Sequence, residues 1–379
     1  MSFEDDVKAE AFHLGFSLCG IAAAQPLAQH AAVYEDWLAA GHHAQMSYLA
    51  AESARLRRAD LSLTLPGVRT VLTVALPYPN PARAAAPADG RLRGRTAAYA
   101  WGQDYHDQIP PRLNQLAAWL QDRLGLPLAH RAYTDTGPIL ERAWGQQAGL
   151  GWFGRNSCLI HPRRGSAFLL GELLLDAELQ PDSPWEADRC GSCTRCVDAC
   201  PTGCILPNRT LDARRCLSYW SIEHKGPIPV QMRPSLGNWV FGCDICQQVC
   251  PWNQHAVHSE VDAAFDFTPE DAFPDLLEAL SLSPVDFNRR FRRTPLARTK
   301  RRGFLRNAAV ALGNLGDPAA VPALVHTLES EPEPLVRAHA AWALGQLHHP
   351  QVRPALEHTR SADPDPSVRL EAAGALAAL

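Results

Sequence analysis

The sequence predicts an α+β protein with an α/β-like leading domain, a ferredoxin-like domain holding two iron–sulfur clusters, and a C-terminal HEAT-like α-helical repeat. Three observations predict it: short apolar runs alternate with helical segments in the first half, cysteines gather at ferredoxin spacing in the middle, and a motif repeats near the end. The predicted divisions are 1–180, 181–258, a helical and basic linker at 259–302, and the repeat at 303–379.

The leading domain is predicted from strand and helix signals. Val68–Leu76 is a short, β-branched apolar run ended by prolines, which is typical of a buried strand. Leu128–Tyr133 is a second strand candidate. Between them, Pro110–Leu124 begins with proline and is followed by Gly125, which predicts a helix.

The end of the leading domain is predicted to form a hairpin. Cys158–Ile160 and Ala167–Leu175 are both apolar, and the turn-forming stretch Pro162–Gly165 lies between them. Strands mixed with helices over about 180 residues make this domain α/β or α+β.

Asp135 is the acid in this domain with the most informative placement. It follows the second predicted strand, in Thr134-Asp-Thr-Gly-Pro138, and precedes a helix predicted through Ala148. Active-site groups of α/β folds commonly lie at such strand-to-helix junctions. The same pattern is also typical of a helix cap, with Asp135 or Thr136 as the N-cap. The pattern alone leaves both interpretations open.

The stretch from Cys190 to Pro251 carries the strongest motif in the chain. Its first run reads C-x2-C-x2-C-x3-C-P and its end reads C-x2-C-x3-C-P, with Cys204 and Cys216 between them. This is the bacterial ferredoxin spacing for 4Fe–4S clusters, in which the fourth cysteine of each run ligates the other cluster. We therefore assign one cluster to Cys190, Cys193, Cys196 and Cys250, and the other to Cys200, Cys216, Cys243 and Cys246.

Zinc and disulfides are the alternatives for these cysteines. Zinc would be satisfied by paired C-x2-C units and needs neither a third cysteine nor the two Cys-Pro endings. Disulfides require an oxidising compartment, for which the sequence gives no indication. Cys204 has no place in the scheme, and we interpret it as a packed thiol.

A basic block precedes the repeat. Between residues 289 and 306 there is no Asp or Glu, whereas Arg or Lys stands at 289, 290, 292, 293, 298, 300, 301, 302 and 306. The chain as a whole has a formal net charge of −4. Positive charge concentrated on an acidic protein indicates contact with a polyanion such as nucleic acid, with solvated surface charge as the alternative.

The end of the chain is predicted to be a HEAT-type repeat. Asn307–Gly313 returns as His339–Gly345, and Leu312, Leu344 and Leu376 are spaced by 32 residues. Small and apolar residues at helical spacing, with prolines between them, predict stacked helix pairs. So short an array is typically an interaction surface.

Together these residues resemble the epoxyqueuosine reductase (QueG) family nearly end to end. Besides the eight cysteines and the HEAT-like tail, the resemblance is carried by Arg58–Asp60, Leu65–Gly67, Tyr99–His106, Thr134–Pro138, Gly149–Asn156, Leu170–Glu172, Ile222–His224, Gly242–Cys246 and Cys250–Asn253. It implies an oxidoreductase that depends on cobalamin and two 4Fe–4S clusters. The implied reaction removes the epoxide oxygen of epoxyqueuosine at the wobble position of tRNA, giving queuosine.

The resemblance also implies roles for individual residues. The clusters would deliver single electrons to cobalamin in the leading domain, and Asp135 would give the proton that the released oxygen needs. The residues expected around cobalamin are Arg58, Asp135, Asn156, Ser166, Ser218 and Asp244. From the basic block, the residues expected to contact the tRNA anticodon stem-loop are Arg298, Lys300, Arg301, Arg302 and Arg306.

Cell compartment and partners are expectations from the same sequence. The N-terminus is acidic without an apolar leader core, and no run reaches the roughly 18 apolar residues of a membrane span, so we expect a cytoplasmic protein without membrane contact. We expect a monomer that receives electrons from an external donor such as a flavodoxin or ferredoxin. The alternatives are a reductive dehalogenase-like cobalamin enzyme and a non-catalytic iron–sulfur electron-transfer protein.

Overall fold

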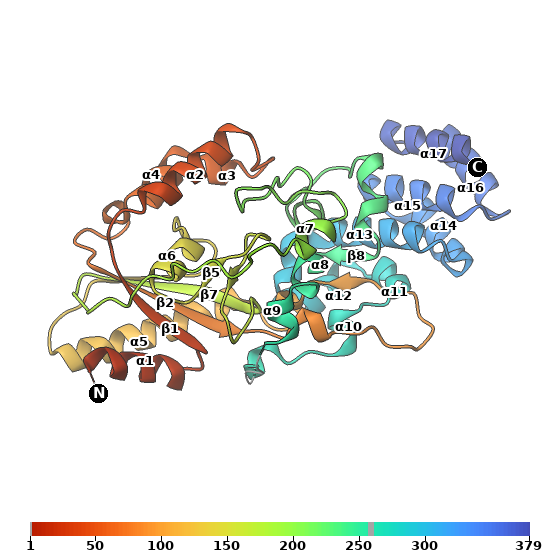
Figure 1. Cartoon of the computed structure of the whole chain (residues 1–379). Helices are drawn as coiled ribbons and strands as arrows, with labels where there is room; N and C mark the ends of the chain where they lie inside the picture. The colour runs from red at the N-terminus through yellow and green to blue at the C-terminus, as the bar shows by residue number, and fades with distance from the viewer. Residues whose placement is uncertain (1, 257–260) are drawn as a thin grey trace. The chain divides into compact units, whose positions relative to one another are not determined.

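The computed structural model describes residues 2–256 and 261–379, which form two compact units (Figure 1). Unit 1 comprises Met1–Ala84, Gly102–Arg214 and Asp244–Asp266, and unit 2 comprises Ala85–Trp101, Arg215–Cys243 and Phe267–Leu379. This division cuts the chain differently from the consecutive segments predicted from the sequence, because 85–101 and 215–243 pair with each other inside unit 2. The predicted boundary at 258/259 lies outside the described residues.

Unit 1 is built on a four-stranded antiparallel sheet. Its order is β1-β2-β7-β4, with β1 at Leu18–Ala23, β2 at Thr70–Pro77, β7 at Phe168–Leu175 and β4 at His130–Tyr133. Every residue of β2 is buried, as its continuous apolar run predicts. In the central strand β7, Glu172 pairs with Thr73 of β2 and with Tyr133 of β4.

Helices cover both faces of this sheet (Figure 1). On one face lie α1 (Phe3–His13) and α5 (Ile109–Leu124), and on the other lies α6 (Glu141–Gln147). Gly171 of β7 packs against α5, whereas Thr73 packs against α6. Because strand side chains alternate between faces, Glu172 points to the α6 side. The predicted helix at 110–124 is confirmed, with Gly125 in the left-handed conformation (φ 66°) at its C-cap.

Of the two interpretations of Asp135 and Thr136 left open by the sequence, the helix cap is wrong. Helix α6 begins at Glu141, and its N-cap residue is Leu140, which makes no side-chain capping bond. Asp135 and Thr136 therefore lie in a loop ahead of the helix, because Asp135 takes a left-handed backbone conformation (φ 56°) that interrupts the chain direction.

The predicted hairpin is also wrong. The strand at Leu159–Ile160 (β6) pairs with Trp152–Phe153 (β5) in a separate two-stranded sheet, whereas β7 joins the main sheet. The turn between β6 and β7 does close, since His161 and Gly165 form an isolated antiparallel bridge. The turn at residues 162–165 is therefore predicted correctly, but the turn does not decide which strands pair.

Short helices complete unit 1. They are α2 (Ala28–Ala39), α3 (Ser47–Ala50), α4 (Glu52–Ala59), α7 (Arg195–Asp198), α8 (Ile245–Gln248) and α9 (Pro251–Gln254). Helices α7, α8 and α9 are single turns within or after the cysteine runs, so the cysteine stretch has little regular structure of its own.

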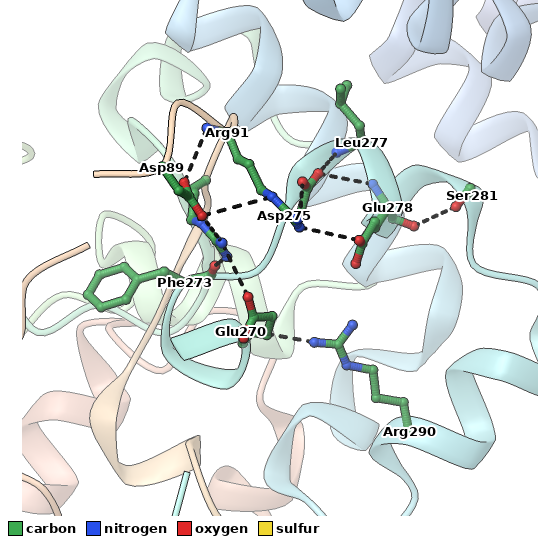
Figure 2. A network of polar contacts seen from close by, with 10 residues as sticks. Asp89, Arg91, Glu270, Phe273, Asp275, Leu277, Glu278, Ser281 and Arg290 are labelled. Atoms are coloured by element: carbon green, nitrogen blue, oxygen red, sulfur yellow. Dashed lines mark hydrogen bonds and ion pairs between the residues drawn. The ribbon is translucent and has the colours of Figure 1, made fainter. Parts of the chain in front are cut away.

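Unit 2 begins with a parallel pair, β3 (Arg95–Thr96) and β8 (Trp239–Phe241). Figure 2 shows the polar network that fixes the segment around β3. Arg91 pairs with Asp275 at 3.7 Å and with Glu278 at 3.6 Å. The Arg93 guanidinium donates to the Phe273 carbonyl at 2.7 Å. The loop after residue 84 is thereby anchored on the stretch that follows residue 267.

The remainder of unit 2 is helical, and the predicted HEAT-like repeat is confirmed. The helices are α10 (Pro269–Ala272), α11 (Leu276–Ser281), α12 (Pro284–Phe291), α13 (Lys300–Leu315), α14 (Val321–Ser330), α15 (Pro334–Leu347), α16 (Val352–Ala362) and α17 (Pro366–Ala378). Helix α15 packs between α13 and α17, and Leu312 and Leu344 are fully buried at equivalent positions. Within the described residues, none of the helices has the length and apolar character to cross a membrane.

Candidate active site

Unit 1 contains a cavity of about 430 Å³ beside α6. Its apolar and aromatic walls include Val33, Tyr34, Trp37, Leu49, Ile139 and Phe153. Its polar lining includes Arg58, Asp135, Glu141, Arg142 and Arg209. The cavity therefore combines flat apolar walls with several fixed cations and one exposed acid, which suits a large polar ligand with a planar core.

Asp135 enters this cavity from the loop between β4 and α6. Its side chain is 61% exposed, so burial does not keep this carboxyl neutral. The Tyr105 hydroxyl donates to Asp135 Oδ2 at 3.1 Å, and His106 Nε2 lies 3.6 Å from the same oxygen. An aromatic hydroxyl and an imidazole thus hold the carboxyl from one side.

His106 is held in turn by Asp104, whose Oδ1 lies 2.7 Å from His106 Nδ1. Partial burial by itself lowers the pKa of His106, but the hydrogen bonds and charges of Asp104 and Asp135 outweigh it and raise the pKa to about 9. His106 is therefore protonated near neutral pH, and a proton is stored 3.6 Å from the Asp135 carboxyl.

A pair of carboxyls lies behind the Asp135 loop. Glu141, the first residue of α6, accepts a hydrogen bond from the backbone N–H of Asp135. Burial raises the pKa of Glu141 to about 7, with the charge of Asp135 acting in the same direction. Burial raises the pKa of Glu172 further still, assisted by neighbouring Glu141. The pair therefore holds at least one proton at neutral pH.

Arg58 lies in the wall of the same cavity as Asp135. Its guanidinium lies 5.4 Å from the Tyr34 ring centre and donates to the Gly137 carbonyl at 3.5 Å. Because Gly137 belongs to the Asp135 loop, Arg58 touches both the cavity wall and the loop that carries the acid.

Four cysteines of unit 1 surround a second cavity, of about 230 Å³. They are Cys190, Cys193, Cys196 and Cys250, the set assigned to one cluster from the spacing. Among the described residues, no three His, Cys, Asp or Glu side chains are placed to hold a single metal ion. Buried Trp152 and Ile160 pack beside Cys250. The Asn156 amide Nδ2, which lines the same cavity, is buried with no hydrogen-bond partner among the described residues.

The second predicted set is divided between the units. Cys200 and Cys246 belong to unit 1, and Cys216 and Cys243 belong to unit 2. Cys204 is buried, and its Sγ lies 3.5 Å from Cys200 Sγ. The assignment of this set remains a prediction from the spacing.

The other residues expected around cobalamin are not among the residues that line the larger cavity. Asn156 lines the cysteine cavity rather than the larger one. Ser166 is buried in unit 1, where its hydroxyl donates to Gln247 Oε1 at 2.9 Å. Asp244 is 2% exposed and stands at the N-cap of α8. Ser218 belongs to unit 2. The structure brings Arg58 and Asp135 together in one cavity, and the cobalamin contacts of all six residues stay predictions.

One prediction for the basic block is wrong. Arg306 is 1% exposed, and its guanidinium donates to the carbonyls of Trp220, His224 and Gly226 at 2.8, 2.8 and 2.7 Å. A side chain so enclosed has no surface to offer to RNA. Its charge instead satisfies backbone carbonyls inside unit 2.

The rest of the predicted RNA contacts separate into paired and open side chains. Arg301 forms an ion pair with Glu331 at 2.6 Å and is 15% exposed, and its contact with RNA stays a prediction. Arg298 is half-exposed and pairs with Glu223 at 2.5 Å. Lys300 and Arg302 are exposed. The exposed members are the ones that remain candidates for a polyanion contact.

Sequence reasoning missed Tyr105, Glu141 and Glu172 as parts of the Asp135 environment. Tyr105 lies in a motif that carries the family resemblance, yet its spacing from Asp135 gives no sign that they touch. Glu172 offered a stronger signal: a single carboxylate inside an apolar strand is rarely buried without a purpose.

Comparison with known proteins gives three family matches. The family model described as "Epoxyqueuosine reductase QueG, DUF1730" matches residues 58–136. The model of a 4Fe–4S double cluster binding domain matches residues 189–253, and the model of HEAT repeats matches residues 295–377. The epoxyqueuosine reductase of Pseudomonas aeruginosa is 41% identical over 332 residues, covering 86% of this chain and 89% of the relative. That of Gloeobacter violaceus is 40% identical over 323 residues, covering 83% and 97%.

Solved structures of epoxyqueuosine reductases are also similar to this chain over nearly its whole length. A crystal structure of epoxyqueuosine reductase with an epoxyqueuosine-modified tRNA-Tyr stem loop matches with a TM-score of 0.91 at 30% identity, covering 99% of this chain and 98% of that one. The Bacillus subtilis enzyme, solved with a catalytic loop swung out of its active site, matches with a TM-score of 0.91 at 29% identity, with the same coverage.

The carboxyl pair makes folding stability depend on pH. Folding raises the pKa of Glu141 from its ordinary 4.5 to about 7, so the folded state binds this proton more tightly than the unfolded state does. The contribution of Glu141 to the free energy of unfolding is therefore fully present below pH 4.5 and is lost as the pH rises through about 7. Glu172→Gln removes one acid, so its stability relative to wild type should increase between pH 5 and pH 8, on the order of 2 kcal/mol. Thermal unfolding of the anaerobic holoprotein across this range measures it. Glu178→Gln, at a 73% exposed position, should show no such trend, and parallel curves for both variants would contradict the prediction.

Proposed function

The chain belongs to the epoxyqueuosine reductase family, and we propose from this premise that it reduces epoxyqueuosine at the wobble position of tRNA to queuosine. The net reaction adds two electrons and two protons and releases the epoxide oxygen as water. The observation that carries the proposal is the placement of Asp135, which lines the large cavity of unit 1 beside a protonated His106.

The donor groups around the cysteine cavity fit a 4Fe–4S cluster. Cys190, Cys193, Cys196 and Cys250 surround it, and the Asn156 Nδ2, which has no partner among the described residues, is a donor of the kind that hydrogen-bonds cluster sulfurs. We propose that these cysteines hold one cluster and that Cys200, Cys216, Cys243 and Cys246 hold the other. The match to a double-cluster domain over 189–253 supports both.

The larger cavity fits cobalamin by its chemistry. Its aromatic and apolar walls suit the faces of a corrin ring, and its arginines are donors for the amide and phosphate oxygens at the ring's edge. Arg58, Arg142 and Arg209 would hold the cofactor there. Bound cobalamin would supply a strong reductant and nucleophile for the epoxide carbon. The chain's own residues then have to orient the substrate, exclude water and supply protons.

Asp135 is the proposed proton donor to the epoxide oxygen. Its exposure toward the cavity allows contact with substrate, and the Tyr105 hydroxyl fixes its orientation. His106 supplies the proton that Asp135 passes on, because it is charged near neutral pH and lies 3.6 Å away. This relay replaces burial as the means by which an exposed carboxyl can act as an acid.

The exposed part of the basic block is proposed to hold the RNA. Lys300 and Arg302, with half-exposed Arg298, offer positive charge for the phosphates of an anticodon stem. The related structure that contains a modified tRNA stem loop supports RNA as the partner. A cytoplasmic location, a monomeric state and an external donor such as a flavodoxin or ferredoxin stay predictions from the sequence.

The other candidate functions are less well supported. The reductive dehalogenase-like alternative is not favoured, since relatives covering most of the chain are epoxyqueuosine reductases. A protein that only transfers electrons would not explain the large cavity of unit 1 or the exposed Asp135 that lines it.

Asp135→Asn should strongly reduce turnover while leaving the fold intact. Asparagine tolerates the left-handed backbone of this position but cannot donate a carboxyl proton, so kcat should fall at least about a hundredfold. Iron content, cobalamin uptake and RNA affinity should match wild type. Asp122→Asn, exposed on α5, is the matched control. Turnover of Asp135→Asn within threefold of the control would remove Asp135 from the mechanism.

Charge reversal at Lys300 and Arg302 tests the RNA surface. Loss of two phosphate contacts should weaken stem-loop binding about tenfold or more at low salt and reduce the slope of log affinity against log salt by about two. Fluorescence anisotropy with a labelled anticodon stem-loop measures both quantities. Reversal at Arg353 and Arg360, exposed on α16, makes the same change in net charge. Equal effects of the two double variants would refute a specific role for Lys300 and Arg302.

A further inference from the structure

The Asp135 loop is held in an uncommon conformation. Asp135 has a left-handed backbone (φ 56°), which costs a residue with a side chain on the order of 1 kcal/mol. Its backbone N–H is turned toward α6, where it donates to Glu141. On the other side of the loop, the Thr134 hydroxyl donates to the Leu170 carbonyl of β7 at 2.7 Å. The reactive acid is therefore fixed through its backbone as well as through its carboxyl.

Glu141 is itself braced from beneath by Glu172. Glu172 is 0% exposed in the central strand, and its carboxyl oxygens have no hydrogen-bond partner among the described residues. Burial raises the pKa of Glu172, and the neighbouring Glu141 carboxyl acts in the same direction. Two facing carboxyls attract only when one is protonated, and burial favours the protonated form of Glu172. Glu141 is left as the acceptor for the Asp135 N–H.

The groups around this pair come from four elements. Asp135 faces Glu141 from the loop, and Arg142 lies next to it on α6. Thr73 of β2 and Tyr133 of β4 flank Glu172 in the sheet. Arg142 acts on Glu141 more weakly than burial and Asp135 do. Among these groups, Asp135 is the proposed proton donor, and Arg142 is one of the residues proposed to hold the cofactor.

A simpler role for Glu141 does not account for these contacts. An acidic residue in the first turn of a helix interacts favourably with the helix dipole, and this would explain a glutamate at the start of α6. It would not explain a side chain that reaches back to the N–H of Asp135, nor a second carboxyl buried beneath it.

We propose that Glu141 is a positioning residue, which keeps the Asp135 loop (residues 134–137) in its reactive conformation by accepting the Asp135 N–H while Glu172 braces it. The inference rests on the proposed function, because it takes Asp135 to be the proton donor. It adds a structural path from the core of the sheet, through the first turn of α6, to the acid. The path depends on an acceptor at position 141 and not on its negative charge.

Two substitutions separate these properties. Glu141→Leu removes the acceptor, so the Asp135 amide should exchange its hydrogen at least about tenfold faster, and kcat should fall about ten- to a hundredfold. KM for the RNA should change less than about twofold, because the loop's position affects the chemical step more than binding. Glu141→Gln keeps an acceptor oxygen and should stay within about threefold of wild type in both exchange and kcat.

Hydrogen exchange read by mass spectrometry over residues 133–140 gives a measure that needs no turnover. Steady-state assays with dithionite and methyl viologen as reductants give kcat and KM. Iron content and exchange in β7 show whether each variant is folded, and Glu178→Leu is the exposed control. Unchanged loop exchange in Glu141→Leu would overturn the inference, as would a Glu141→Gln variant as impaired as Glu141→Leu. Absence of epoxyqueuosine turnover in the wild type would instead contradict the proposed function.

Discussion

A carboxyl buried in the middle of a β-sheet has to be neutral or paired. In this protein, that requirement connects the core of the sheet to the loop that carries Asp135. Glu172 is fully buried in β7, and the group that meets it is Glu141 on α6. The start of α6 therefore packs against the sheet beside a buried carboxyl, and burial favours the protonated form of that carboxyl. The loop that carries Asp135 is joined to the same point through its backbone. The position of the proposed acid is thus a property of the core, even though its side chain is exposed.

The same principle governs the basic block of unit 2. Arg306 is enclosed and donates to three backbone carbonyls, and Arg301 is committed to Glu331. Burial costs the guanidinium group much of its hydration, which these carbonyls replace. Basic residues that look alike in the sequence therefore differ in role. The buried ones bond to groups within unit 2, whereas exposed ones such as Arg302 present their charge to solvent.

The sequence predicts well those features that depend on local spacing. Residue type and spacing within one continuous stretch predict the burial of β2 and the packed helices of the repeat. The spacing of the cysteines likewise predicts that Cys190, Cys193, Cys196 and Cys250 lie around one cavity. The sequence fails where a long-range partner decides. The turn after β6 is correctly placed, yet β7 pairs with β2 and β4, which are distant in the chain. Asp135 resembles a helix cap locally, but the contact with Glu141 takes its backbone elsewhere. No periodicity reveals that Arg306 lies inside.

The proposed reaction requires that the large cavity of unit 1 hold a corrinoid and that the same chain carry two iron–sulfur clusters. The most direct measurement is the iron and cobalt content of protein reconstituted anaerobically, incubated with cobalamin and freed of excess cofactor. The account predicts about eight irons and about one cobalt per chain. About eight irons with no retained cobalt would contradict it and leave an electron carrier.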